Sequence, residues 1–216
     1  MKKTFVKISV LASLLFMFSC GTESKETTQE ETDVEETLEE NCTYSYSKEN
    51  TKVNWVAFKT TQKIGVSGDF LNFTIDGTNE AKNPLDVVRG ASISIPVSSV
   101  ETADEGRNAK IVEFFFGTFT DTENLEGTVK EMSEDGTGIL TLKMNGIEND
   151  VPVTLVVEGA RIKISTTIDL GDWDGQAAID MLNEKCKGKH TGEDGITKLW
   201  PDVKVNISTE LVKNCK

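Results

Sequence analysis

Apolar and polar residues alternate along several stretches of the chain. Val151, Val153 and Leu155 share one face of such a stretch, with proline or a polar residue between them. The same alternation runs through residues 161–170 and 202–211. A period of two residues is typical of antiparallel strands that bury one face and expose the other. The pattern therefore predicts a mainly antiparallel β protein.

Turns that contain glycine separate the alternating stretches. Asp135-Gly136, Asn145-Gly146 and Glu158-Gly159 are hairpin signals, so residues 124–170 are expected to form a meander of four strands. Further strands are expected at 43–48, 52–59, 67–76, 92–97 and 202–211. Eight or nine strands either close into a barrel or split into a two-sheet sandwich. The alternation by itself leaves both architectures open.

Two stretches have helical spacing instead. The first begins at Asp104 and runs into the three consecutive aromatic residues Phe114–Phe116. A short helix with so much aromatic surface must cover a hydrophobic opening or a core. The second helix is expected at 174–185, with Asp174 as its N-cap. A long polar loop is expected to follow at 186–201, and loops of this length often carry function.

The N-terminal segment differs in character. Residues 1–19 join a basic start to an apolar run that is too short to span a bilayer, as in a secretion signal. Cys20 stands at the end of this run, directly after a small residue. It is expected to be the lipidated cysteine of a bacterial lipoprotein. An ordinary secretion signal with an incidental cysteine is the alternative. Residues 20–41 are then the lipidated cysteine and an acidic flexible tether, and residues 42–216 form one domain.

Charge narrows the class of partners. The chain has a net charge of −13, of which the signal contributes three lysines and residues 21–41 contribute nine acids and one lysine. Residues 42–216 therefore keep a net charge of about −8. An acidic domain without a basic stripe repels nucleic acid, so no nucleic-acid partner is expected. Attachment to a membrane would rest on the acyl chains of Cys20.

Residues with catalytic or metal-binding chemistry are sparse. His190 is the single histidine and follows Cys186 at a Cys-x3-His spacing, but no third group that would orient the pair is apparent. Asp169, Asp172 and Asp174 cluster without the spacing of a calcium loop. A surface histidine and a solvated turn are the preferred interpretations. We expect no catalytic residues, no metal site and no enzyme activity.

Several motifs are shared with a known family. A Ser-Val-x-Thr turn after a strand leads into a Glu-x-Arg-Asn element and then a Phe-Phe pair. Its residues are Val97, Ser99, Val100, Thr102, Glu105, Arg107, Asn108, Phe114 and Phe115. Further matching segments are Val53–Trp55, Gly65–Phe73, Leu140–Gly146, Val151–Leu155 and Asp202–Ile207. Over about residues 50–211 these motifs resemble the YceI-like family of lipocalin-like, polyisoprenoid-binding proteins. The chain departs from the family pattern at Asn108, Lys110 and Val151, where Asp, His and Lys are usual.

The resemblance favours the barrel and implies a function. The fold it implies is an all-β, eight-stranded antiparallel lipocalin-like barrel with one or two short helices. A long isoprenoid lipid or a quinone would occupy the barrel lumen, and the protein would bind it without catalysis. The residues expected to contact this ligand are apolar residues of the alternating strands and of the helix: Trp55, Phe70, Phe73, Phe114, Phe115, Phe116, Leu142, Leu155 and Ile164.

The lipoprotein signal, together with the resemblance, implies a cellular location. The expected location is the cell envelope of a Gram-negative bacterium, with attachment to the outer membrane through acylated Cys20. The alternative is a surface or stress-related interaction lipoprotein with a filled barrel and no ligand. A homodimer remains open.

A closed barrel also predicts which cysteines form a disulfide. A secreted protein can form disulfides. The domain has three cysteines, Cys42, Cys186 and Cys215, so one thiol is left unpaired. With an even number of strands the first and last strands are neighbours. Cys42 precedes the first strand and Cys215 follows the last, so we expect these two to pair and Cys186 to be free. A bridge between Cys186 and Cys215 is the alternative.

Overall fold

The computed structural model of the protein describes residues 41–216. The predicted signal, the lipidation of Cys20 and the acidic tether up to residue 40 lie outside the described residues. No helix of the described part is long and apolar enough to cross a membrane.

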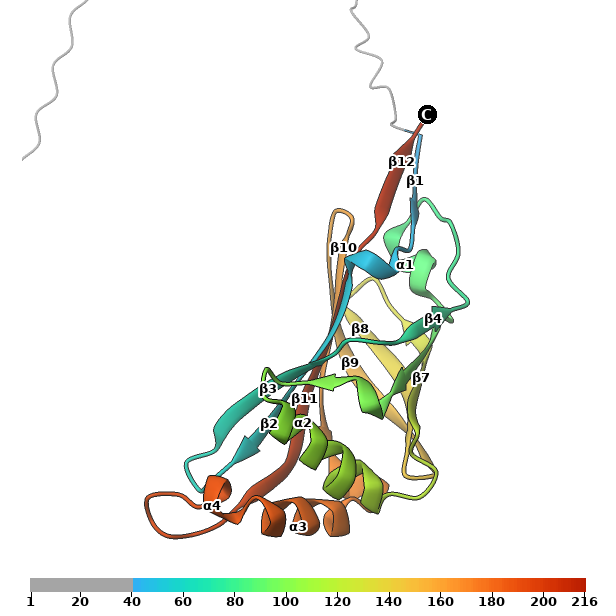
Figure 1. The fold of residues 1–216 in the computed structure, drawn as a ribbon. Helices are drawn as coiled ribbons and strands as arrows, with labels where there is room; N and C mark the ends of the chain where they lie inside the picture. The colour runs from blue at the N-terminus through green and yellow to red at the C-terminus, as the bar shows by residue number, and fades with distance from the viewer. Residues whose placement is uncertain (1–40) are drawn as a thin grey trace, which may run out of the picture. The chain divides into compact units, whose positions relative to one another are not determined.

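Twelve strands and four short α-helices make up residues 41–216 (Figure 1). The strands are β1 (Cys42–Ser45), β2 (Thr51–Lys59), β3 (Ile64–Phe70), β4 (Thr74–Asp76), β5 (Ser92–Pro96), β6 (Val100–Glu101), β7 (Asn124–Met132), β8 (Thr137–Met144), β9 (Ile147–Glu158), β10 (Arg161–Asp169), β11 (Leu199–Glu210) and β12 (Val212–Cys215). The helices are α1 (Pro84–Val88), α2 (Glu105–Lys110), α3 (Gln176–Lys185) and α4 (Lys187–His190).

Ten of the strands form one antiparallel sheet that curls on itself. The strand order is β4-β5-β7-β8-β9-β10-β11-β2-β3-β6. The two edge strands of this sheet are β4 and β6. Each is the continuation of a strand at the opposite edge, because β3 leads into β4 and β5 leads into β6. Between β5 and β6 the strand bends in a 3-10 turn at Val97–Ser99, where Ser99 accepts a hydrogen bond from the Leu71 N–H. Counted as two bent strands, β3–β4 and β5–β6 complete a ring. The predicted lipocalin-like barrel class is confirmed, although the sheet has ten separate strands and not the predicted eight.

The terminal strands form a separate two-stranded ribbon. β1 pairs with β12 in the register Cys42↔Cys215, and a disulfide joins these two cysteines. This is the pair expected from the sequence, and Cys186 is the free cysteine of the described part. The expected geometry was wrong in one respect. The predicted first strand at 43–48 lies outside the barrel, and the barrel neighbour of β11 is β2.

The interior of the barrel contains two apolar clusters. The first includes Trp55, Phe116 and Trp173 and lies under α3, which contributes Ala178 and Ile179. The second cluster lies under α1 at the ribbon end (Figure 1). It consists of Leu85, Val87, Val88, Met132, Val153, Leu155, Ile162, Ile164 and Leu211. Helices α2, α3 and α4 therefore lie at one end of the barrel, and α1 and the disulfide ribbon lie at the opposite end (Figure 1).

The aromatic helix starts where the sequence predicts. The Asp104 carboxylate caps α2 by accepting a hydrogen bond from the Arg107 N–H. After Lys110 the helix widens into a π-helical turn at Ile111–Phe115 and ends in a 3-10 turn. Such widened turns occur often at functional sites.

The second helix begins later than predicted. Asp174 is not its N-cap, because this residue has left-handed backbone angles, with φ 53°, at the end of the preceding 3-10 turn. Gly175 stands at the cap position, where a Cβ atom would lie 2.6 Å from the Leu170 carbonyl oxygen. The predicted loop at 186–201 also contains structure, since it holds α4 and the first residues of β11.

Candidate functional site

A cavity of about 460 Å³ opens into the helix-covered end of the barrel. Its walls are mainly apolar side chains that the strands point inward, including Trp55 and Ala57 of β2 and Val203 and Val205 of β11. Pockets that hold small ligands typically measure about 300–1,000 Å³ and are mostly apolar. The barrel is therefore hollow at this end, contrary to the alternative of a filled barrel.

Aromatic rings from the helical segment form one side of this cavity. Phe115 and Phe116 are buried, and their ring centroids lie 5.0 Å apart in an edge-to-face arrangement. Phe70 of β3 packs against Phe116 at 6.4 Å, and Phe119 packs against Phe115 at 5.0 Å. Edge-to-face packing of this kind stabilises a rigid apolar wall.

Trp55 forms another side and requires a glycine beside it. A Cβ atom on Gly68 of β3 would lie 2.4 Å from Trp55 Cζ2, so only glycine leaves room for the indole in this position. The Trp55 side chain is buried, and its Nε1–H finds no acceptor among the described residues. The Trp55 indole therefore contains one buried hydrogen-bond donor without a partner among the described residues.

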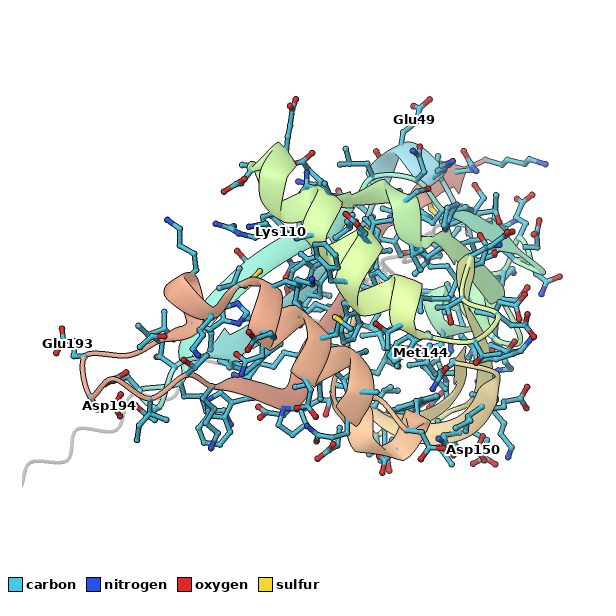
Figure 2. All side chains as sticks on the ribbon, turned by 60° about the horizontal axis from the view of Figure 1, so that its bottom comes forward. Glu49, Lys110, Met144, Asp150, Glu193 and Asp194 are labelled. Atoms are coloured by element: carbon cyan, nitrogen blue, oxygen red, sulfur yellow. A yellow bond between two sulfur atoms is a disulfide. The ribbon has the colours of Figure 1, made fainter. Side chains whose placement is uncertain are left out.

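The mouth of the cavity is charged. Lys59, Arg107, Lys110 and Lys189 line it together with one acid, Asp104. Figure 2 turns the α3 end toward the viewer, with Lys110 on α2 and Met144 on β8 at two points of the lining. The loop that carries Glu193 and Asp194 projects to the side.

His190 is buried in the lining of the same cavity. Its Nδ1 lies 3.0 Å from Asn183 Oδ1, so the protonated Nδ1 donates to this amide oxygen. Burial, followed by the positive charges of Lys59 and Lys110, lowers the pKa of His190 from 6.5 to about 4. The imidazole is therefore neutral at pH 7. The preferred interpretation of His190 as a surface residue was wrong.

The arrangement around His190 does not resemble a catalytic pair. Cys186 also lines the cavity, but the imidazole bonds to Asn183 and the described residues show no hydrogen bond between the thiol and the ring. No group of three or more His, Cys, Asp or Glu side chains in residues 41–216 is placed to hold a metal ion.

Four of the predicted ligand residues line the cavity: Trp55, Phe70, Phe115 and Phe116. Phe73, Phe114 and Leu142 do not. Phe73 is buried in the first apolar cluster, 5.6 Å from Lys48 Nζ, and Phe114 lies under Lys185, whose Nζ is 5.2 Å from the ring centroid. Leu142 packs at the edge of the same cluster.

Leu155 and Ile164 do not line this cavity either. Both belong to the second cluster, at the ribbon end, and Ile164 lines a separate hollow of about 60 Å³. Alternation correctly turns both side chains inward, but it does not tell at which height along the barrel they lie. The basic residues of the mouth were not predicted from the sequence, because they come from three separate elements and form no motif.

Comparisons with known proteins agree with this fold. The YceI-like domain model matches residues 44–211. A polyisoprenoid binding domain from Saccharophagus degradans, implicated in plant cell wall breakdown, has a similar structure, with a TM-score of 0.54 and 15% identity. The alignment covers 82% of this chain and 99% of that one.

BcnA of Burkholderia cenocepacia is similar to the same degree. Its TM-score is 0.51 at 15% identity, and the alignment covers 79% of this chain and 99% of that protein. No curated protein matches the sequence. The family match spans most of the chain and coincides with the barrel and its helical cover, so the chain belongs to the YceI-like domain family.

Proposed function

We propose that the protein binds an isoprenoid-type lipid, or a quinone with an isoprenoid tail, in the 460 Å³ cavity and carries or sequesters it without catalysis. The observation that carries the proposal is the combination of a hollow barrel end with an aromatic cover. The structural similarity to a polyisoprenoid binding domain supports the choice of ligand class.

The physical driving force is burial of apolar surface. An isoprenoid tail offers little besides hydrocarbon, and the cavity wall is mostly hydrocarbon and aromatic rings. Burying roughly 500 Å² of such a ligand would contribute on the order of 12 kcal/mol before the costs of ordering and association. No catalytic residue is needed for this binding.

A cavity-filling substitution tests the proposal. Ala57 lines the cavity, so Ala57→Phe should place a ring inside it. Ala177→Phe is the matched control, because Ala177 is exposed on α3. Native mass spectrometry after gentle purification should detect a bound isoprenoid in the wild type and in Ala177→Phe. Ligand occupancy in Ala57→Phe should fall by about tenfold. Equal occupancy in both variants would place the ligand elsewhere.

The proposed location is the outer membrane of a Gram-negative bacterium, with Cys20 as the lipid anchor. A bacterial lipoprotein carries more than one acyl chain on this cysteine, and stable attachment takes about two chains. Cys20→Ala should therefore move the protein from the membrane fraction to the soluble fraction, while Cys186→Ala should leave it at the membrane. Unchanged partitioning of Cys20→Ala would refute the anchor.

A further inference from the structure

The sign of the charge at the cavity mouth is opposite to that of the domain. Residues 42–216 carry a net charge of about −8. The cavity lining nevertheless contains three lysines and one arginine against a single carboxylate, that of Asp104. Clefts lined by one sign of charge raise the local concentration of the opposite ion. The mouth is therefore a positive spot on an acidic protein.

The lysines of this mouth are not neutralised by partners within the described part of the chain. Arg107 pairs with Asp104, at 3.6 Å between Nη2 and Oδ2. Lys59, Lys110 and Lys189 take part in none of the ion pairs found in residues 41–216. Lys59 Nζ donates one hydrogen bond to the Lys189 carbonyl oxygen at 2.9 Å, which leaves two of its three donors for a ligand.

These charges border one cavity. Lys59 comes from β2, Lys110 from the end of α2 and Lys189 from α4, and all three border the same cavity. His190 lines the same cavity as these lysines. Lysine stems can lie along apolar walls while their ammonium groups stay at the opening.

We infer that the cavity selects an amphiphile whose long apolar tail ends in an anionic head, a phosphate or a carboxylate, held at the mouth by Lys59, Lys110 and Lys189. The inference rests on the proposed lipid binding and adds the charge of the ligand's head. A neutral alcohol or a quinone ring would fill the same cavity but would leave the lysines without partners. Charge-assisted hydrogen bonds from ammonium to phosphate are among the stronger polar contacts.

A pair of probes with the same tail tests the inference. Geranylgeranyl phosphate and geranylgeraniol differ only in the head group, and the affinity of the wild type for each is measured by competition in detergent-free buffer. The wild type should bind the phosphate at least about tenfold more tightly, and raising the salt concentration should reduce this preference. Inorganic phosphate alone should bind far more weakly, because it buries no tail.

Two double variants test whether the lysines of the mouth cause the preference for the phosphate over the alcohol. In Lys59→Met/Lys110→Met the affinity for the phosphate should fall to that of the alcohol, while the affinity for the alcohol stays the same. Lys163→Met/Lys187→Met is the control with the same change of net charge, since both lysines are exposed and outside the cavity lining. This control should keep the wild-type preference. Thermal unfolding checks that all variants are folded.

The outcomes separate this inference from the proposed function. If the wild type binds both probes equally at low salt, the head-group inference is wrong and lipid binding stands, whatever the variants do. If inorganic phosphate binds as tightly as the lipid phosphate, the lysines form an anion site that is independent of the cavity, and the inference is again wrong. If neither lipid binds, both the inference and the proposed function fail.

Discussion

Single residues decide whether the cavity keeps its shape, and Gly68 is the clearest case. Its absent side chain makes room for the Trp55 indole, and a Cβ atom there would also lie 2.8 Å from the Glu101 carbonyl oxygen. We predict that Gly68→Ala lowers the free energy of unfolding by about 1–3 kcal/mol, as overpacking does elsewhere. Chemical denaturation measures this loss.

The matched control for this substitution is Gly188→Ala. Gly188 lies in α4, and a Cβ atom there meets nothing within 4 Å. Alanine in a helix is better tolerated than glycine, so this variant should be neutral or slightly more stable. If Gly68→Ala is as stable as Gly188→Ala, the fit between Trp55 and Gly68 does not constrain the wall.

His190 should make the stability depend on pH. Its pKa is about 4 in the folded protein and near 6.5 when unfolded, because burial and the charges of Lys59 and Lys110 disfavour the protonated ring. A lowered pKa means that the unfolded state binds the proton more readily. Up to about 3 kcal/mol of stability should therefore be present above pH 6.5 and lost as the pH falls toward 4.

A substitution isolates this effect from the titration of carboxylates. His190→Gln keeps a side chain that can donate to Asn183 but does not titrate. The free energy of unfolding, measured from pH 7 to pH 4.5, should fall more steeply in the wild type than in His190→Gln. Parallel curves for the two proteins would show that the histidine is not buried in neutral form.

At the scale of elements, the disulfide ribbon and the cavity should be independent. The Cys42–Cys215 bridge closes a loop with a sequence separation of 173 residues and lies at the barrel end opposite α3 (Figure 1). We predict that Cys42→Ser/Cys215→Ser lowers the stability by about 2–5 kcal/mol, as loss of a native disulfide does in small secreted domains. Binding of isoprenoid should be unchanged.

Reduction supplies the control for this prediction. With reductant present the wild type should unfold at the same denaturant concentration as the double serine variant, and the variant should not respond to reductant. Loss of lipid binding in a folded serine variant would mean that the ribbon supports the cavity from a distance.

The elements were more predictable than their ends and their places along the barrel. Period-two alternation and the Asn145-Gly146 type of turn depend on neighbouring residues, so they correctly predicted the strands of the meander. The start of α3 depends on how Asp174 and Gly175 pack against Leu170, which is a tertiary contact. Likewise, the bends that divide β3 from β4 and β5 from β6 depend on contacts between strands.

At the scale of the whole molecule, the barrel is hollow at one end and filled at the other. The large cavity lies at the end covered by α2, α3 and α4, while the ribbon end is packed around Leu155 and Ile162 apart from a hollow of about 60 Å³. Sequence alternation could tell inward from outward residues but not one end from the other. That is why four predicted ligand residues line the cavity while Leu155 and Ile164 lie at the opposite end.

The basic mouth is likewise a property of the whole fold. Lys59, Lys110 and Lys189 are brought together only when β2, α2 and α4 meet at the open end of the barrel. In the sequence each is one lysine among many, and the net negative charge of the domain conceals them. A site assembled from distant elements is therefore visible only in the structure.

Photo-crosslinking tests the central claim most directly. An isoprenoid that carries a photoreactive diazirine on its tail is bound to the wild-type protein, irradiated, and the modified peptides are mapped by mass spectrometry. The crosslinks should fall on β2 near Trp55 and on Ile111, Phe115 and Phe116, which line the cavity. Crosslinks confined to the outer face of the sheet, or to the second cluster around Leu155, would contradict lipid binding in this cavity.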